Sequence, residues 1–283
     1  MTRINRDTCA VITGGARGLG LALARRLVAK NARVALADCH EQALQSAHAK
    51  LTREVAGAVV STHVVDVSQP GDLLRLRKEV VARHTSVNIV INNAGVTHYG
   101  AFEELSRAEI TRVLEVNLMG VIDGCQTFLP LLREAGGGHV VNMSSMAAIV
   151  GMPRQSSYCA SKAAVRAFSQ SLRAELRGSG IGVTWMVAGG IGTNFLHHAT
   201  STRPAISQWL AKMLQRRGYD VDRAAQAILR GVRQNRGEVR LTRDCEALYQ
   251  ANRMSPRLVG WLMSQLHRLA VRYETSTSPP KQE

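Results

Sequence analysis

Short apolar runs alternate with segments of helical periodicity through the first two thirds of the chain. The apolar runs are rich in β-branched residues, and in the segments between them apolar positions recur every three or four residues. The pattern predicts strands at 9–13, 33–38, 61–67, 87–91, 138–143 and 182–187. It predicts helices at 19–30, 41–55, 72–84, 106–132 and 158–177.

This alternation predicts an α/β fold with one parallel sheet. Near-continuous apolar strands are typical of a sheet covered by helices on both faces, and right-handed crossovers then favour a doubly wound, Rossmann-type topology. Because no repeat or linker interrupts the pattern, we expect a single catalytic domain over 1–274 and a polar tail at 275–283. A further amphipathic, basic helix is predicted at 255–273.

Composition narrows the class of protein. With 45% hydrophobic and 20% charged residues, the 283-residue chain can bury a large core, which excludes wholesale disorder. Its apolar runs are too short to span a membrane, and its first residues do not resemble a secretory signal. The five cysteines are scattered without a CxxC pair, so we expect reduced thiols, no zinc site and a cytoplasmic location.

The chain is strongly basic, with 36 Lys+Arg against 21 Asp+Glu and a net charge of +15. The densest stretch, 203–240, has nine basic and three acidic residues but no nucleic-acid-binding motif. We therefore favour a solvated basic face over acidic ligands or lipid headgroups, and we do not expect nucleic-acid binding.

A glycine-rich segment joins the first predicted strand to the first helix. It reads Thr13-Gly-Gly-Ala-Arg-Gly-Leu-Gly20. Gly14 would turn the chain sharply, Gly18 would admit a phosphate group, and Gly20 would let the helix pack against the sheet. The spacing GxxxGxG predicts a cradle for a dinucleotide pyrophosphate, and a glycine-rich turn without ligand is the alternative.

Two acids follow later strands of the predicted sheet. Asp38 ends the second strand, where a carboxylate can bind both ribose hydroxyls of NAD and would repel the 2′-phosphate of NADP. Arg17 could pair with that phosphate, but we favour NAD over NADP. Asp66, after the third strand, either accepts from the adenine amine or caps a helix.

Tyr158 and Lys162 lie four residues apart, one turn along the same helix face. An ammonium group beside a phenol favours the phenolate and should lower the tyrosine pKa toward neutrality. Ser145, thirteen residues earlier, closes the fifth strand at the carboxyl edge of the sheet, where ligands bind. Its hydroxyl could hold a substrate oxygen while Tyr158 moves the proton.

These motifs, taken together, resemble the short-chain dehydrogenase/reductase family over residues 10–193. The resemblance depends on Thr13-Gly-x-x-x-Gly-x-Gly20, Asn92-Asn-Ala-Gly95, Asn117, Ser145 and Tyr158-x-x-x-Lys162, which agree with the family in order and spacing.

The resemblance implies roles for the catalytic residues. Tyr158 would be the general acid/base and Ser145, chosen over Ser144 by its spacing to the tyrosine, would orient the substrate. Lys162 would bind the nicotinamide ribose, and Asn117 would hold a proton-relaying water, although alone it could be a buried structural residue. No metal ligand is expected. Besides Tyr158 and Lys162, the expected cofactor contacts are Gly14, Arg17, Gly18, Leu19, Gly20, Asp38, Asp66, Val67, Asn93, Ala94, Gly95, Gly189, Ile191 and Thr193.

One departure from the family pattern follows the sixth strand. The family usually has Pro-Gly there, whereas this chain has Ala188-Gly189. Loss of the fixed proline φ could loosen the path that leads to Ile191 and Thr193, and with it the position of the nicotinamide ring.

Apolar side chains dominate the expected substrate side. Residues 194–217 occupy the place of the family's substrate lid, and the segment between Ser145 and Tyr158 adds further apolar positions. They favour a lipophilic substrate, and ordinary core or dimer packing is the alternative. The helix at 255–273 could lie on a membrane surface, but packing against its own subunit or a neighbour is the favoured expectation.

The sequence therefore predicts an NAD(P)-dependent oxidoreductase that interconverts a secondary alcohol and a ketone. By resemblance, we expect a homodimer or homotetramer. The alternatives are a catalytically silent dinucleotide-binding protein and a protein whose main role is membrane-surface or nucleic-acid binding.

Overall fold

The apolar runs form a seven-stranded parallel sheet with the order β3-β2-β1-β4-β6-β7-β9. The computed structural model describes residues 2–193, 195, 199–202 and 204–277. The α/β fold class predicted from the sequence is confirmed. The strands are β1 Cys9–Thr13, β2 Arg33–Asp38, β3 Val60–Val64, β4 Ile89–Asn92, β6 Gly138–Met143, β7 Ile181–Val187 and β9 Glu238–Arg240.

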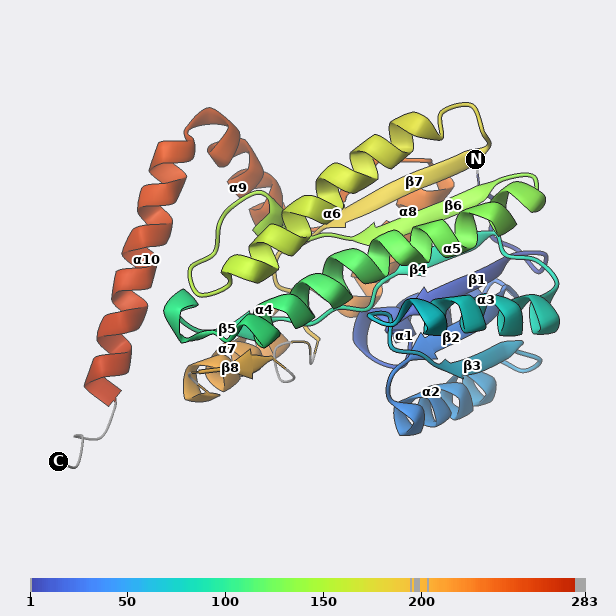
Figure 1. Ribbon diagram of the computed structural model, residues 1–283, viewed down its shortest axis with the longest axis horizontal. Helices are drawn as coiled ribbons and strands as arrows, with labels where there is room; N and C mark the ends of the chain where they lie inside the picture. The colour runs from blue at the N-terminus through green and yellow to red at the C-terminus, as the bar shows by residue number, and fades with distance from the viewer. Residues whose placement is uncertain (1, 194, 196–198, 203, 278–283) are drawn as a thin grey trace.

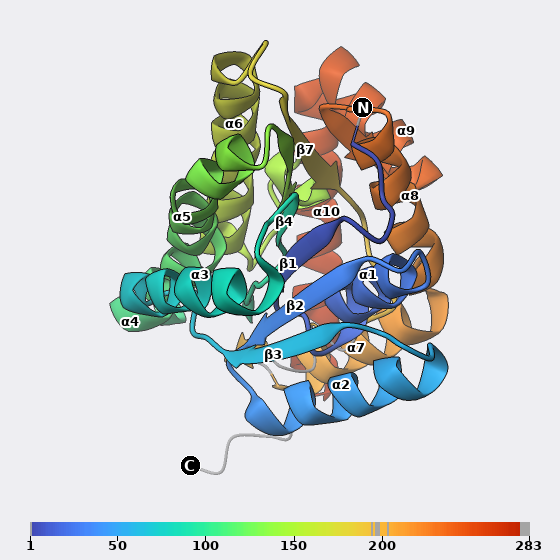
Figure 2. The same cartoon turned by 90° about the vertical axis from the view of Figure 1, so that its right-hand side faces the viewer.

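Helices cover both faces of this sheet, as Figure 2 shows along the strands. One face buries the apolar sides of α1 (Gly18–Val28), α2 (Glu41–Glu54) and α8 (Val221–Arg233). The other face buries those of α3 (Pro70–His84), α5 (Gly120–Glu134) and α6 (Ser156–Glu175). Burial on both sides explains why the strands are apolar at successive positions instead of alternating.

The strand order reverses between β1 and β4. The chain moves outward from β1 to β2 and β3, and then returns to pair β4 with the other side of β1. Loops leaving β1 and β4 therefore diverge, and a crevice at the carboxyl ends of these strands is the usual ligand site of such sheets.

The single long helix predicted at 106–132 is divided in the structure. Helix α4 (Arg107–Leu114) begins at a capping box between Ser106 and Glu109 and runs into a π-helical turn, η2 (Glu115–Met119), before α5. Such turns widen the helix by one residue and often mark functional positions. Here the widened turn contains Asn117.

The C-terminal third contains elements that the hydrophobic pattern did not predict. They are β8 (Thr200–Ser201), which pairs with β5 (His98–Tyr99), together with α7 (Pro204–Arg217), α8, β9 and α9 (Arg243–Met254). The short 3-10 turns η1 (Phe102–Glu104) and η3 (Met146–Ala148) were also not predicted. Of the predicted lid at 194–217, positions 194, 196–198 and 203 lie outside the described residues.

The last helix, α10 (Pro256–Thr277), confirms the predicted C-terminal helix but extends three residues into the stretch predicted as a polar tail. Ser255 caps it, and proline suits its first position. Figure 1 shows α10 standing beside the body of the molecule, at the end where the strands finish. Among the described residues, no helix combines the length and apolar character needed to cross a membrane.

Candidate active site

The loop between β1 and α1 requires glycine at three positions. Gly14 (φ 60°) and Gly18 (φ 51°) adopt the left-handed conformation that other residues avoid. A Cβ on Gly14 would lie 2.9 Å from the Cα of Ala94, and one on Gly20 would collide with the carbonyl oxygen of Gly14. The predicted cradle is therefore formed by backbone that no larger side chain could follow.

Helix α1 begins at this loop with its N-terminus open. Among the described residues, no side chain caps it at Arg17, and no acid lies in its first turn. The free amides and the positive end of the helix dipole suit a pyrophosphate, so the loop fits a dinucleotide. Arg17 is exposed beside it, whereas the side chain of Leu19 is buried in the core and leaves only its backbone for a ligand.

Asp38 lies at the carboxyl end of β2, facing the glycine loop. Its Oδ2 accepts from the backbone N–H of Ala16 at 3.2 Å, and its Oδ1 accepts from the N–H of His40 at 3.1 Å. The carboxylate is thus fixed at the loop, where the sequence predicted a ribose ligand. The Ala16 contact was not predicted, because it depends on the loop path.

Asn93 and its neighbours join β4 to the glycine loop. Asn93 Nδ2 donates to the carbonyl oxygens of Thr13 and Gly14 at 3.0 and 2.9 Å. Thr13 Oγ1 accepts from the backbone N–H groups of Asn93 and Ala94 at 3.0 and 3.1 Å. These bonds hold Asn93-Ala94-Gly95 along the crevice. The anchoring role of Thr13 was missed, although its place before Gly14 is a usable indication.

Asp66 and Val67 follow β3, and Asp66 already has several partners. It accepts from the N–H and hydroxyl of Ser68 at 3.0 and 2.8 Å and pairs with Arg112 at 3.0 Å. Burial would raise the pKa of Asp66, but these bonds outweigh it and hold the pKa below its usual value. Asp66 therefore holds the turn after β3 and does not cap α3, whose first turn follows Gln69 without a side-chain cap. Val67 is buried against Gly120 of α5.

Asn117 is fully buried in the π turn and clamps the segment after Gly95. Its Oδ1 accepts from the N–H of Val96 at 2.8 Å, and its Nδ2 donates to the carbonyl of Val96 at 2.9 Å and to Ser161 Oγ at 3.1 Å. A Cβ on Gly95 would lie 3.2 Å from Asn117 Oδ1. Asn117 thus connects the crevice to α6, and the contribution of Ser161 was not predicted.

Lys162 is buried on α6, with its ammonium group directed at the end of β6. Nζ donates to the carbonyl of Met143 at 2.9 Å and lies 5.7 Å from the centroid of the Tyr158 ring. Burial lowers the pKa of Lys162 to about 8. Ser144 donates to the backbone carbonyl of Lys162 at 2.9 Å, so its hydroxyl is structural and Ser145 is left for the site.

Tyr158 and Ser145 meet across the crevice. The Ser145 hydroxyl interacts with the Tyr158 hydroxyl and lowers its pKa. Ser145 Oγ also accepts from the N–H of Ala147 at 3.2 Å. Burial raises the pKa of Tyr158 to about 12, and the bond with Ser145 only partly opposes it. The prediction that Lys162 lowers this pKa is wrong for the protein without cofactor, because desolvation dominates and the lysine bonds to Met143.

The segment after β7 is fixed by its neighbours despite Ala188. The carbonyl of Ala188 accepts from the N–H of Met146 at 2.8 Å, and residues 190–192 pair with Tyr219 through bonds of 2.9 and 3.0 Å. Thr193 then packs against Gly18, with its Cγ2 3.4 Å from a Cβ built there. Thr193 therefore lies beside the glycine loop, and the contacts of this segment replace the constraint of proline; that Ile191 and Thr193 contact the cofactor stays a prediction.

Gly189 lies farther along the same strand end, against α9. A Cβ built there would lie 3.2 Å from Asp244 Oδ2 and 3.6 Å from Met146 Cε. Phe195, from the predicted lid, reaches the catalytic residues. Its ring centroid is 6.1 Å from that of Tyr158, and its edge lies 3.8 Å from a Cβ built on Gly95.

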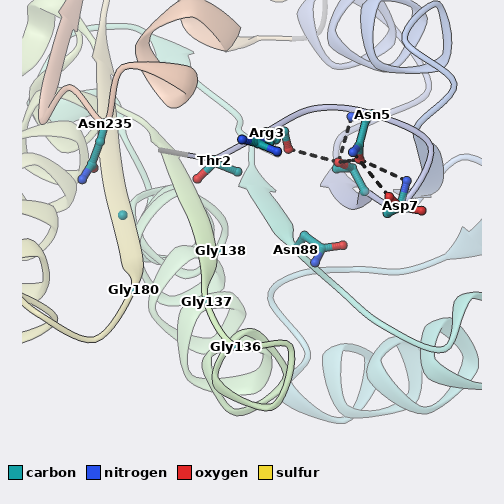
Figure 3. Close-up of a pocket in the computed structure, with 12 residues that line it drawn as sticks. Thr2, Arg3, Asn5, Asp7, Asn88, Gly136, Gly137, Gly138, Gly180 and Asn235 are labelled. Atoms are coloured by element: carbon teal, nitrogen blue, oxygen red, sulfur yellow. Dashed lines mark hydrogen bonds between the residues drawn. The ribbon is translucent and has the colours of Figure 1, made fainter.

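A separate hollow of about 290 Å³ lies at the opposite, amino end of the strands (Figure 3). Its wall contains Gly136–Gly138, Gly180 and a turn in which the N–H of Asp7 donates to Asn5 Oδ1 at 3.1 Å. None of the predicted catalytic or cofactor residues lines it. This hollow is therefore not the predicted active site, whose residues lie at the carboxyl ends of the strands.

Comparison with known proteins identifies relatives that are named as dehydrogenases or oxidoreductases. The family model of short chain dehydrogenases matches residues 8–204. EphD of Mycobacterium tuberculosis, named as an oxidoreductase, is 34% identical over 260 residues, which cover 89% of this chain and 44% of EphD. This chain thus spans less than half the length of that relative. SadH of the same species, also named as an oxidoreductase, is 35% identical over 236 residues, which cover 81% of this chain and 84% of SadH.

A solved structure shows the same architecture. The short chain dehydrogenase/reductase from Burkholderia phymatum in complex with NAD has a TM-score of 0.83 and 26% identity, covering 91% of this chain and 96% of its own. Its fold and bound dinucleotide agree with the glycine cradle described above. This chain therefore belongs to the short chain dehydrogenase family of NAD(P)-binding oxidoreductases.

Proposed function

We propose that the protein interconverts a lipophilic secondary alcohol and the corresponding ketone with NAD as cofactor. The observation that carries this proposal is the contact between Ser145 and Tyr158, with Lys162 beneath the tyrosine and the glycine cradle alongside. A hydroxyl pair of this kind can hold one substrate oxygen and exchange one proton with it.

Each of the catalytic residues has a separate task. Ser145 Oγ donates to the substrate oxygen and orients it toward Tyr158. In the reductive direction Tyr158 Oη gives its proton to that oxygen, and in the oxidative direction it removes the proton of the alcohol. The bound nicotinamide dinucleotide supplies the hydride exchange. Lys162 and Asn117 hold the segments around the tyrosine, and we infer that the backbone of Asn117, whose side chain is bonded to Val96 and Ser161, holds a water that returns the proton to solvent.

The two buried groups set the direction of the pH dependence. A tyrosine with a pKa of about 12 is protonated at neutral pH, whereas a lysine with a pKa of about 8 is mostly charged there. Tyr158 is therefore ready to act as an acid but must lose its proton to act as a base. We expect alcohol oxidation to accelerate as pH rises from 7 toward 10, because the phenolate fraction grows, whereas ketone reduction should change little because Tyr158 keeps its proton over that range.

NAD is favoured because of Asp38. Gly14, Gly18, Gly20 and the start of α1 would hold the pyrophosphate, and the fixed carboxylate would accept from the ribose hydroxyls. A 2′-phosphate would bring a second anion to the same place. Exposed Arg17 favours NADP, but it lies on a flexible side chain in water, where an ion pair contributes little.

The substrate class follows from the side chains around Tyr158. Phe195 packs against Tyr158, and the half-buried Met146 and Ile149, in the loop after Ser145, pack against a buried apolar cluster. We infer that a substrate at Tyr158 meets this apolar surface. Such a lining favours an apolar ketone over a sugar. The alternative remains that these residues only pack the core.

A second copy of the chain would complete the enzyme. Family members pair through the helices that carry the equivalents of Asn117 and Tyr158, and here Met119 is 45% exposed at that position. We therefore propose a dimer or tetramer.

The five cysteines are free, which suits the reducing cytoplasm.

A panel of apolar alcohols and ketones, assayed with NAD and NADP in parallel, tests this function. The variant Tyr158→Phe should lose about 10³-fold in kcat while still binding NAD, because only the proton is removed. Tyr249→Phe, the same change on α9, should keep full activity. If the wild type binds NAD but turns over no member of the panel with either cofactor, the silent binding protein is the better interpretation.

A further inference from the structure

Helix α10 presents a stripe of large apolar side chains to solvent. Leu258, Trp261, Leu262, Leu266 and Leu269 are 42–60% exposed. Their spacing of three and four residues places them on one face of the helix. Contiguous apolar surface of this kind on a soluble protein marks a surface that something else covers.

The body of this chain does not cover the stripe. Within the described part of the chain, α10 packs mainly against α9, and Val259, close to the start of α10, is buried. Figure 1 shows α10 standing apart from the sheet and its covering helices. The side chains of the stripe are thus exposed in the described chain, and we infer that their partner is external.

The charge around the stripe limits the choice of partner. Residues 247–273 contain four arginines and no acid, in a chain of net charge +15. Arg257 and Arg268 are exposed on α10 itself. A second copy would bring the same positive charge to the contact, whereas an anionic lipid surface supplies the opposite charge.

We propose that α10 docks the enzyme on an anionic lipid surface. Leucines and a tryptophan on one face, with arginines beside them, are the composition of helices that lie in the membrane interface with the apolar face among the acyl chains. The helix lies parallel to the surface and does not cross the membrane. Arginine side chains beside the stripe bind the lipid phosphates.

The docked face lies near the substrate side of the site. Asn252 Nδ2 of α9 donates to the carbonyl of Ile149 at 3.1 Å, which connects α9 and α10 to the loop that follows Ser145. Trp209 of α7 is 56% exposed, and Figure 1 shows α7 at the same end of the molecule as α10. Given the proposed function, the lipid bilayer is then the source of a lipophilic substrate.

Vesicle sedimentation of the full-length protein tests the docking. Vesicles of phosphatidylcholine containing about a third phosphatidylglycerol should bind it at least tenfold more tightly than pure phosphatidylcholine, and added salt should weaken the binding. Arg257→Gln with Arg268→Gln should reduce the affinity about fivefold per arginine. The matched pair Arg230→Gln and Arg233→Gln, exposed on α8, should reduce it much less.

Apolar variants separate lipid from protein partners. Leu262→Ser with Leu266→Ser should weaken vesicle binding more than tenfold, whereas Leu74→Ser with Val81→Ser, exposed on α3, should not. The proposal is overturned if the wild type ignores anionic vesicles, or if the Leu262/Leu266 variant binds them unchanged. It is also overturned if light scattering shows that this variant dissociates the oligomer while lipid binding persists, because the stripe then binds a second copy.

Activity measurements keep the two proposals distinguishable. With a water-soluble ketone the Leu262/Leu266 variant should match the wild type, and with a vesicle-dissolved ketone it should be several-fold slower. Equal rates on the vesicle-dissolved ketone would overturn the substrate-delivery step. Vesicle binding without turnover of any substrate would refute the proposed function while leaving the docking intact.

Discussion

The crevice and the C-terminal helix use apolar residues in opposite ways. All five residues of β1 are buried, because helices cover the sheet on both faces, and the glycine loop that follows is held by backbone contacts. Along α10 the large apolar side chains are mostly exposed, with Val259 as the buried exception among those described. The first region is completed within the chain, and the second requires something outside it.

Among the changes in β1 and its glycine loop, Gly20→Ala should have the largest effect. A methyl group there would collide with the carbonyl oxygen of Gly14 and push the loop away from Asn93, 2.8 Å from the new atom. We expect a loss of about 3 kcal/mol in the free energy of unfolding and loss of NAD binding, measured by denaturant titration and calorimetry.

Gly71→Ala is the matched control, because nothing lies within 4 Å of a Cβ at that position near the start of α3. It should leave stability and NAD binding close to those of the wild type. Unchanged NAD binding in Gly20→Ala would show that the loop is not the cradle.

The parts of this region that the sequence predicted share one physical property. Strands buried on both faces and a loop that requires glycine leave direct traces in the residue types, so β1, β2 and the glycine loop between β1 and α1 were placed correctly. The π turn around Asn117 leaves no such trace, because one extra residue in a helix barely alters its periodicity. The pKa of Tyr158 was misjudged since burial cannot be read from the Tyr-x-x-x-Lys spacing alone.

The second largest effect on the central sheet should come from acid. His84 is buried behind β3, and its Nε2 forms a hydrogen bond of 2.7 Å with Ser61 Oγ. Burial lowers the pKa of His84 to about 4, and the nearby positive charges of Arg33, His63 and Arg83 add to this effect. Because the unfolded chain takes up the proton first, stability is present above pH 6.5 and is lost as pH falls toward 4.

We expect this histidine to account for about 2 kcal/mol of the loss between pH 7 and pH 5. His84→Gln should flatten the pH dependence of unfolding by that amount, whereas His48→Gln on α2 should not. An equal slope in wild type and His84→Gln would contradict the assignment.

Asp38→Asn tests the preference of the glycine-loop region for NAD over NADP. The amide keeps the shape of the carboxylate and removes its charge, so repulsion of a 2′-phosphate disappears beside exposed Arg17. The ratio of kcat/KM for NADP to that for NAD should rise about tenfold, which corresponds to ~1.4 kcal/mol. An unchanged ratio would mean that Asp38 does not face the ribose.

The C-terminal third was predicted poorly for a different reason. Helix α8 buries Ala224, Ala225, Ile228, Leu229 and Val232 at helical spacing, so its apolar face can be read in the sequence and was overlooked. The strand β9 has three residues and a buried centre, Val239, between charged neighbours. Helix α10 was predicted because its stripe is strong, yet the same stripe could indicate a core, a neighbour or a membrane, and sequence alone does not distinguish them.

The smallest effect should come from the stripe on α10, and it separates the two regions most directly. Leu262→Ser removes a side chain that nothing in the described chain covers, so the free energy of unfolding without lipid should change by less than about 0.5 kcal/mol. Val259→Ser, in the first turn of the same helix, removes a buried side chain and should cost about 2 kcal/mol. If both variants were equally destabilised in dilute solution, the stripe would be covered within the isolated protein, and the contrast between a region completed by the chain and one completed by a membrane would fail.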